Sequence, residues 1–340
     1  MKFLVLGAGA IGCYVGARLA AAGQRVAFVG RPHVIDPLAQ GGLTVSDLDG
    51  FEAHLSATQL SLHTAVAQGW AALNPEDGSA GQTVVLLCVK GGATAAAARE
   101  IGDHCPPGTV VVSLQNGVEN VDRIAQAAPG LQAVAGMVPY NVVMPQPHRV
   151  HRATEGPLQL ADTPETRAMA DTFIASGLPT VLASDMRAVQ WGKLLLNLNN
   201  PVNALSDLPL LEELRDRDFR RVLAALQTEA LQVLDVAGIQ PAQVAKSPPR
   251  LLPTILRLPN WAFNRVAASM LRMDASARSS MWEDVQRGRT TEIDDLCGAV
   301  VRLAAAHGAN APRSAVMCRL MAEHRIGQRW SGPDLRRAVG

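Results

Sequence analysis

A lysine and two asparagines stand at helical spacing near the middle of the chain. Lys193, Asn197 and Asn200 occupy positions i, i+4 and i+7 of a leucine-rich segment that ends at Pro201, so on a single helix they share one face. Buried polar groups need hydrogen-bond partners, and a bound ligand can provide them. The stripe therefore predicts a ligand site. The simpler alternative is a lysine that reaches solvent, with asparagines that cap the chain before the proline.

Three glycines near the N-terminus have the spacing of a phosphate-binding turn. Gly7, Gly9 and Gly12 form G-x-G-x-x-G between the apolar run Phe3 to Leu6 and the helix-like segment Ala10 to Ala22. In a dinucleotide-binding unit the first glycine permits the turn, the second admits a pyrophosphate, and the third lets the helix, whose N-terminus faces the phosphates, lie close to the strand. The alternatives are a glycine-rich turn in another α/β protein and a secretory signal, which the glycines interrupt. The expected cofactor contacts are Gly7, Gly9, Ala10, Ile11 and Gly12.

The second predicted strand, residues 25–31, ends without an acidic residue. NAD-specific sites carry an Asp or Glu near this point, which binds the ribose 2′-hydroxyl, but this chain has Gly30 and Arg31. An arginine can pair with a 2′-phosphate, which a carboxylate would repel. The sequence therefore favours NADP(H) over NAD(H), and the alternative is a solvated surface arginine.

Two further predicted strands, Thr83 to Val89 and Thr109 to Leu114, end at polar residues. Lys90 follows the first strand and Asn116 follows the second. Ligands of doubly wound sheets bind beyond the carboxyl ends of the strands, so Lys90 and Asn116 join Arg31 as candidate contacts. The Asn-Gly pair at this point also fits an ordinary turn.

The overall composition argues against several classes of partner. The 31 basic and 30 acidic residues nearly balance, so nothing indicates nucleic acid or an anionic membrane, and no apolar run is long enough to span a bilayer. The five cysteines are scattered and form no CxxC or Cys/His cluster. This pattern predicts free thiols in a cytoplasmic protein without a metal site. The glycine turn and the polar stripe, by contrast, indicate small molecules as partners.

The chain of 340 residues is long enough for two domains. Strand and helix patterns alternate to about residue 185, and helical patterns follow to the end. The stretch 33–82 is less regular and could hold a loop and short strands at 43–45 and 54–56. We expect an α/β protein, with an NADP-binding Rossmann-type doubly wound sheet in 1–185 and an all-helical domain in 186–340. Long helices are expected over 210–237 and 253–273, and their apolar character is compatible with a homodimer.

The segment 279–294 contains two patterns typical of helix starts. Ser280 with Glu283, and Thr291 with Asp294, have the spacing of capping pairs. Taken alone, this spacing favours Ser280 as an N-cap and Glu292 as an acid that offsets the helix dipole.

Together these residues resemble the ketopantoate reductase (2-dehydropantoate 2-reductase) family. The resemblance implies a Rossmann domain followed by a helical domain, an active site between them, and NADPH-dependent reduction of 2-dehydropantoate to pantoate, a step towards pantothenate. The motifs that carry it are Gly7-x-Gly9-x-x-Gly12, Arg31, Cys88-Val-Lys90, Gln115-Asn116-Gly117, Lys193-x-x-x-Asn197 and Ser279-Ser-Met…Gly288-Arg-Thr-Thr-Glu-Ile-Asp294.

The resemblance also implies roles for individual residues. Lys193 matches the lysine that hydrogen-bonds the ketone and supplies the proton, which suits a reaction that builds negative charge on the carbonyl oxygen. Glu292 matches a glutamate that binds the hydroxyl side of the substrate and orients the lysine, and Ser280 matches a contact to the substrate carboxylate. Arg31 and Lys90 match contacts to the cofactor phosphates. The asparagines that match substrate- or cofactor-facing positions are Asn116 and Asn197.

Two positions depart from the family pattern. Better-known members have a second asparagine eight residues after the lysine, immediately before a proline, whereas Asn200 stands at seven. Ala277 replaces an asparagine that contacts substrate in some members. The stretches near 60–82 and 245–265 are longer than in many members. These departures leave two alternatives. One is a reductase of another branched 2-oxo acid, and the other is a non-catalytic NADP-binding regulator, against which the lysine and glutamate together argue.

Overall fold

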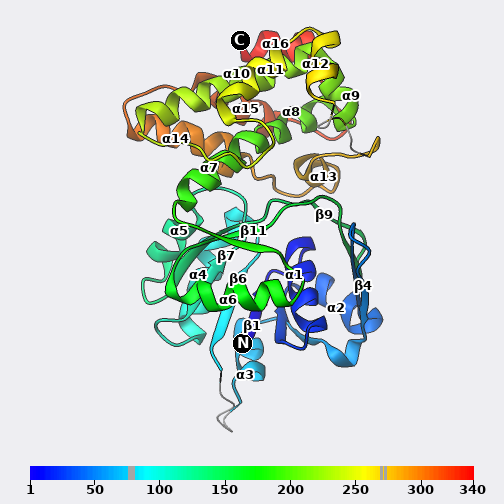
Figure 1. Cartoon of the computed structure of the whole chain (residues 1–340), viewed down its shortest axis with the longest axis vertical. Coiled ribbons are helices and arrows are strands. Elements are labelled where there is room, and N and C mark those ends of the chain that lie inside the picture. The colour runs from blue at the N-terminus through cyan, green and yellow to red at the C-terminus, as the bar shows by residue number, and fades with distance from the viewer. Residues whose placement is uncertain (76–80, 269–270, 272–273) are drawn as a thin grey trace. The chain divides into compact units, whose positions relative to one another are not determined.

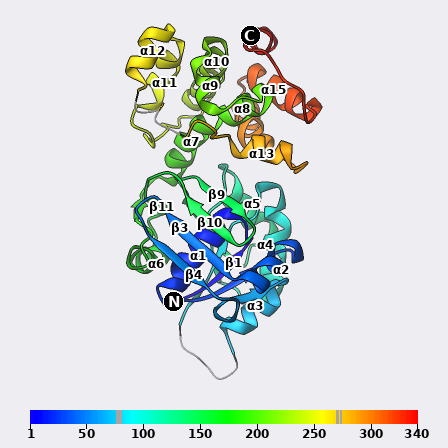
Figure 2. The same ribbon diagram turned by 90° about the vertical axis from the view of Figure 1, so that its right-hand side faces the viewer.

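The computed structural model describes all residues except 76–80, 269–270 and 272–273. The chain divides into two compact units, Met1–Met186 and Arg187–Gly340. The first contains strands and helices and the second contains helices (Figures 1 and 2). The predicted α/β class, with an N-terminal parallel sheet and a helical C-terminal part, is confirmed.

An eight-stranded sheet forms the centre of the first unit. Its strands are β1 (Lys2–Leu6), β2 (Arg25–Val29), β5 (Ser61–His63), β6 (Thr83–Leu87), β7 (Val110–Ser113), β8 (Gln132–Met137), β11 (Leu158–Ala161) and β12 (Thr180–Ala183). They lie in the order β12-β11-β8-β7-β6-β1-β2-β5. The six strands from β8 to β5 are parallel, and β11 runs antiparallel to β8. The parallel part has the 3-2-1-4-5-6 order of a dinucleotide-binding sheet.

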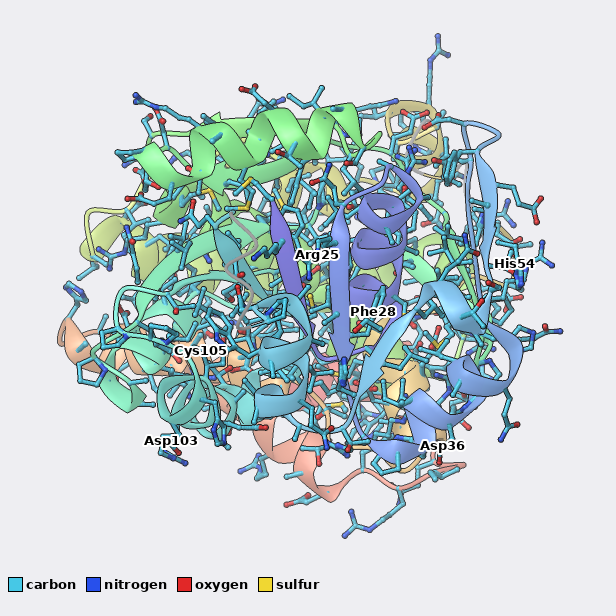
Figure 3. All side chains as sticks on the ribbon, turned by 90° about the horizontal axis from the view of Figure 1, so that it is seen from below. Arg25, Phe28, Asp36, His54, Asp103 and Cys105 are labelled. Atoms are coloured by element: carbon cyan, nitrogen blue, oxygen red, sulfur yellow. The ribbon has the colours of Figure 1, made fainter. Side chains whose placement is uncertain are left out.

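Successive side chains of the central strands pack on opposite faces of this sheet. On β1, Leu4 and Leu6 belong to one core and Phe3 and Val5 to the other. Strands covered on both faces need such continuous apolar sequence, and Phe28 of β2 is likewise fully buried (Figure 3). One face is covered by α3 (Val66–Leu73), α4 (Thr94–His104) and α5 (Asn120–Ala127), and the other by α1 (Ala10–Ala21) and α6 (Pro164–Ala175).

A second, four-stranded sheet of order β4-β3-β10-β9 packs against the other side of α1. Because α1 lies between two sheets, its residues from Gly12 to Leu19 are all buried. The one charged side chain of α1, Arg18, pairs with Asp47 of β3 at 2.6 Å between Nη1 and Oδ2. The strands are β3 (Leu43–Asp47), β4 (Glu52–Leu55), β9 (Val142–Gln146) and β10 (Arg149–Arg152).

Residues 33–82 contain short strands near both expected positions, but the stretch is more regular than expected and also contains helices. It contributes β3 and β4 to the second sheet, β5 to the main sheet, and the helices α2 (Pro32–Gly41) and α3. Residues 76–80, within the stretch expected to be longer than in relatives, lie outside the described residues.

The second unit is built around one long helix, α10, which contacts α8, α9, α11, α14, α15 and α16. No helix in the described part of the chain is long and apolar enough to cross a membrane. The helices are α7 (Met186–Asn197), α8 (Asn199–Ser206), α9 (Leu210–Arg215), α10 (Arg217–Val236), α11 (Leu252–Arg257), α12 (Asn260–Val266), α13 (Ser280–Gln286), α14 (Ala299–Ala306), α15 (Pro312–Glu323) and α16 (Gly332–Val339).

Two helices expected to be continuous are interrupted. The helix expected over 210–237 breaks at Asp216, which has extended backbone and whose carboxylate accepts from the N–H of Asp218 at 2.8 Å to start α10. The helix expected over 253–273 breaks before Pro259, because the residue before a proline disfavours helical backbone. Positions 269–270 and 272–273 of that expectation lie outside the described residues.

Candidate functional site

The predicted cofactor contacts of the first unit lie at one edge of the main sheet. In the register of the parallel strands, Leu6 of β1 pairs with Val29 of β2 and with Leu87 of β6. Leu87 in turn pairs with Ser113 of β7. The four strands therefore end at the same level, where doubly wound sheets bind ligands. The candidate residues that follow these ends are Gly7, Arg31, Lys90 and Asn116.

The steric roles predicted for the first and third glycines are confirmed. Gly7 has a φ of +105°, and a Cβ there would lie 2.7 Å from the backbone of Cys88. A Cβ on Gly12 would lie 2.2 Å from the carbonyl oxygen of Gly7, so only glycine lets α1 approach the turn. By contrast, an exposed Gly9 has open space where its Cβ would point.

The start of α1 fits a pyrophosphate. Gly9 occupies the N-cap position without a side-chain cap, and the first turn carries no acidic side chain. The N–H groups of this turn are therefore not engaged by a capping side chain, and the positive end of the helix dipole is not offset. Such a turn can accept a phosphate group against its backbone.

Arg31 is exposed at the N-cap position of α2, directly beyond β2 and Gly30. The first turn of α2 contains no acidic residue, so the guanidinium and the helix N-terminus present positive charge together. Lys90, also exposed, holds the same position at the end of β6, before the short turn η2 (Gly91–Ala93).

A buried network that the sequence did not reveal fixes the loop of Asn116. The Nε2 of Gln115 donates to the carbonyl of Val89 at 2.9 Å and to Oγ1 of Thr94 at 2.7 Å. Thr94 donates to Oδ1 of Asn120 at 2.9 Å, and Asn120 donates to the carbonyl of Asn116 at 2.7 Å. The network ties the loop after β7 to the loop after β6. The sequence feature that could have indicated this network is Gln115, a polar residue directly after a buried strand.

Lys193 and Asn197 lie on α7, but α7 ends at Asn197 and Asn200 is in the first turn of α8. The single helix expected for the three residues is therefore wrong after Asn197. The junction at Leu198 is held from α10, where the buried side chain of Gln227 donates through Nε2 to the carbonyl of Leu195 at 3.0 Å.

The backbone of α7 is tightly packed beside Lys193. A Cβ on Gly192 would lie 2.2 Å from the carbonyl oxygen of Ala242, and the N–H of Ala242 donates to the carbonyl of Ala188 at 2.9 Å. Burial lowers the pKa of Lys193 from 10.5 to about 8, because desolvation penalises the ammonium. A lysine with this pKa can donate and accept a proton near neutral pH.

The N-cap of α13 is Ser279, so the interpretation of Ser280 as the cap is wrong. Oγ of Ser279 accepts from the N–H of Trp282 at 3.1 Å and donates to the carbonyl of Asn200 at 3.3 Å. Ser280 is the first residue of α13 and is exposed. The hydrogen bond from Ser279 therefore brings the segments of Ser280 and Asn200 together.

Glu292 is half-buried and stands just before a π-helical turn, η4 (Asp294–Gly298). Its carbonyl accepts from the N–H groups of Asp295 at 3.0 Å and Leu296 at 3.2 Å. The turn has no side-chain cap, and its N-cap position is Ile293, so the capping pair predicted for Thr291 is wrong. Single π-turns often occur at functional sites.

Metal ligands do not gather in the described residues: no group of three or more His, Cys, Asp or Glu side chains is placed to hold an ion. All five cysteines are free thiols, as the sequence predicted.

Comparison with known proteins identifies relatives across both units. The profile of the family "Ketopantoate reductase PanE/ApbA" matches residues 3–165, and the profile "Ketopantoate reductase PanE/ApbA C terminal" matches residues 185–325. The 2-dehydropantoate 2-reductase of Halobacterium salinarum is 29% identical over 320 residues, covering 92% of this chain and 95% of that protein. That of Pyrococcus horikoshii is 26% identical, covering 92% and 93%.

Solved structures show the same fold. A PanE/ApbA family ketopantoate reductase from Ralstonia eutropha matches with a TM-score of 0.76 and 27% identity, covering 95% of this chain and 98% of that one. A D-mandelate dehydrogenase bound to NADH and anilino(oxo)acetate matches with a TM-score of 0.74 over the same shares of the two chains. At 20% identity, the second likeness shows the fold alone.

Proposed function

The chain belongs to the ketopantoate reductase family of oxidoreductases, and from this premise we propose that it reduces 2-dehydropantoate to pantoate with NADPH. The observation that supports this chemistry most directly is the pKa of Lys193, which is lowered to about 8 by burial. An ammonium with that pKa is mostly protonated at neutral pH and still acidic enough to give up its proton.

The first unit binds the cofactor in this proposal. The N-terminus of α1 at Gly9 holds the pyrophosphate, and Arg31 and Lys90 hold further phosphate charge, with Arg31 at the 2′-phosphate. Asn116 and the backbone of Ala10 and Ile11 complete the contacts. The open space at Gly9 and the exposed arginine at the end of β2 support this assignment. When bound, the cofactor supplies the hydride.

The second unit holds the substrate and moves the proton. Lys193 donates a hydrogen bond to the ketone oxygen, stabilises the negative charge that develops there, and transfers its proton to give the alcohol. Ser280 binds the substrate carboxylate, and Glu292 binds the hydroxyl side and orients the lysine. Asn197 and Asn200 hold the remaining polar groups. An exposed Ser280, not used as a helix cap, supports its role.

A reductase of another 2-oxo acid is the second candidate. Asn200 stands one residue closer to the lysine than the family pattern places its asparagine, and Ala277 has no polar side chain. A D-mandelate dehydrogenase shares the fold, so the same architecture acts on a different 2-hydroxy acid in that protein. The free cysteines support a reducing, cytoplasmic location for either activity.

A substrate panel tests the proposal. Ketopantoate, its analogue without the hydroxyl group and an aryl 2-oxo acid are offered to the purified protein, and NADPH consumption is followed by absorbance. We expect the highest kcat/KM with ketopantoate. Turnover of a different 2-oxo acid without turnover of ketopantoate would reject the substrate and keep the reaction class. No turnover of any of them, with tight NADPH binding, would favour the regulator.

A further inference from the structure

A carboxyl group that the proposed reaction does not use is buried in the second unit. Glu213 of α9 has no exposed surface, and neither has Asn203 of α8. The Nδ2 of Asn203 donates to Oε2 of Glu213 at 2.7 Å and also to the carbonyl of Leu208 at 3.0 Å. Within the described residues Glu213 forms no ion pair, so an ionised carboxylate here would be an uncompensated buried charge.

The other carboxyl oxygen, Oε1, is buried without a hydrogen-bond partner. The amides of Asn203 and Asn199 favour the ionised form of Glu213, but burial outweighs them and raises its pKa to about 8, because desolvation penalises the carboxylate. Glu213 is therefore mostly a neutral acid at neutral pH.

The charged side chains on the helices packed against α9 have partners of their own. Asp207, at the end of α8, accepts from Nε1 of Trp282 at 2.6 Å. At the start of α10, Asp216 caps the N–H of Asp218, and Asp218 pairs with Arg336 at 2.8 Å. Two arginines of α10 donate to backbone carbonyls. Arg217 donates to the carbonyl of Arg257. Arg220 donates to the carbonyls of Leu214, Arg215, Leu256 and Leu258. These contacts leave burial as the main influence on Glu213.

The other end of Asn203 reaches the substrate-binding segment. Its Oδ1 accepts from the N–H of Ser279 at 2.9 Å, and Ser279 donates to the carbonyl of Asn200 at 3.3 Å. Asn203 thus connects Glu213 to the residue that precedes Ser280 and, through Ser279, to Asn200. The hydrogen bonds therefore run from Glu213 to two segments that carry candidate substrate contacts, Asn200 and Ser280, and every link lies in the second unit.

We propose that Glu213 is a positioning residue: as a neutral acid it accepts from Asn203 and so fixes Ser279, and with it the positions of Ser280 and Asn200 at the substrate. Ionisation of Glu213 places an uncompensated charge in the buried contact between α8 and α9 and loosens this segment, which lowers the affinity for the 2-oxo acid at alkaline pH. This inference rests on the proposed function of Ser280 and Asn200. Glu213 itself does not touch the substrate.

The variant Glu213→Gln separates positioning from catalysis. Glutamine keeps the shape and can accept from Asn203 through its amide oxygen, but it cannot ionise. The matched control is Glu212→Gln, the exposed neighbour on the same helix. KM for the 2-oxo acid and kcat are measured for all three proteins from pH 6 to 9.

In the wild type and in Glu212→Gln we expect KM to rise by up to about tenfold one pH unit above the pKa of Glu213. In Glu213→Gln, the part of this rise that comes from Glu213 should be absent, so KM should rise less than in the other two proteins. The effects of proton loss from Lys193 on kcat and KM should remain in all three proteins. An alkaline rise of KM in Glu213→Gln as large as in the wild type would overturn the proposal, and so would a glutamine variant that fails to fold, because glutamine reproduces the neutral acid.

A second measurement does not depend on turnover. The folded-state pKa of about 8 lies above the ordinary 4.5, so the neutral acid stabilises the fold below pH 4.5, and this stabilisation is lost as the pH rises through about 8. Thermal unfolding of the wild type should show this loss relative to Glu213→Gln. The infrared difference between the two at pH 7 should contain the carbonyl band of a protonated acid. Absence of that band overturns the proposal even if no substrate has been found, whereas its presence without reductase activity rejects only the proposed function.

Discussion

In the first unit the candidate ligand contacts come largely from backbone geometry, whereas in the second they are side chains at the ends and interruptions of helices. Four parallel strands end in register and place the turn of Gly7 beside the loops that follow β2, β6 and β7. In the second unit, Asn200 and Ser280 lie in the first turns of α8 and α13, and hydrogen bonds between side chains and backbone hold these turns together.

This difference separates two kinds of tolerance to substitution. A backbone site depends on which positions can accept a Cβ, so its weak points are glycines. A side-chain site depends on charge and hydrogen bonding, so its weak points are the polar groups and the buried residues that hold them. Substitutions in the two units should therefore affect different measured quantities.

The largest effect is expected from Lys193→Ala. It removes the proposed proton donor and the charge that stabilises the carbonyl oxygen, and we expect kcat to fall by about 100-fold or more. The Kd for NADPH should not change, because the lysine belongs to the second unit. Stopped-flow or steady-state absorbance measures the first quantity and fluorescence titration the second. The control is Lys246→Ala, an exposed lysine of the same unit. A kcat equal to that of the control would remove Lys193 from the chemistry.

The glycine turn should respond in two distinct ways. At Gly9 an added methyl meets nothing in the protein, so Gly9→Ala should keep its Tm and weaken NADPH by at least about tenfold, since the methyl occupies the space of the pyrophosphate. At Gly12 an added Cβ meets the carbonyl of Gly7 at 2.2 Å, so Gly12→Ala should lower the free energy of unfolding by about 1–3 kcal/mol. Thermal unfolding and NADPH titration measure both variants. Unchanged NADPH affinity in Gly9→Ala would show that no phosphate approaches this turn.

A smaller and more selective effect is expected from Arg31→Ala. Loss of a charge-assisted contact to the 2′-phosphate should weaken NADPH by about tenfold and leave NADH nearly unchanged. The matched control is Arg25→Ala, an exposed arginine at the opposite end of the same strand (Figure 3). Equal weakening of the two cofactors in Arg31→Ala would identify Arg31 as a surface charge without a role in cofactor choice.

The first unit was the more predictable from sequence because its constraints are local. Apolar strand runs, a glycine turn and the polar residues at strand ends are adjacent in the chain, and sheet register then brings them together. The sequence did not predict that β4, β3, β10 and β9 pair to form a second sheet. Its parallel pair β3 and β10 joins segments about a hundred residues apart, and short strands with one exposed face carry little signal of their partners.

The second unit was predictable in class but not in detail. Apolar periodicity indicated helices correctly, yet it did not show where they break. The backbone before Leu198 is held by Gln227 of α10, which is distant in the sequence, and the carboxylate of Asp216 caps the next helix. The N-cap of α13 also could not be predicted from the sequence, because two adjacent serines have equal capping ability. In the structure Ser279 is the cap, and its N–H donates to the side chain of Asn203, which is distant in the sequence.

The position of α1 between two sheets has a consequence for synthesis of the chain. Asp47, which forms a buried pair with Arg18, also lies 3.6 Å from Nη2 of Arg152. Arg152 pairs as well with Asp49, which is 103 residues earlier in the chain. Until β10 has left the ribosome, the second sheet lacks two of its four strands, and one side of an almost wholly apolar helix is incompletely covered. A nascent first unit is therefore exposed to aggregation, and to chaperone binding, for most of its synthesis.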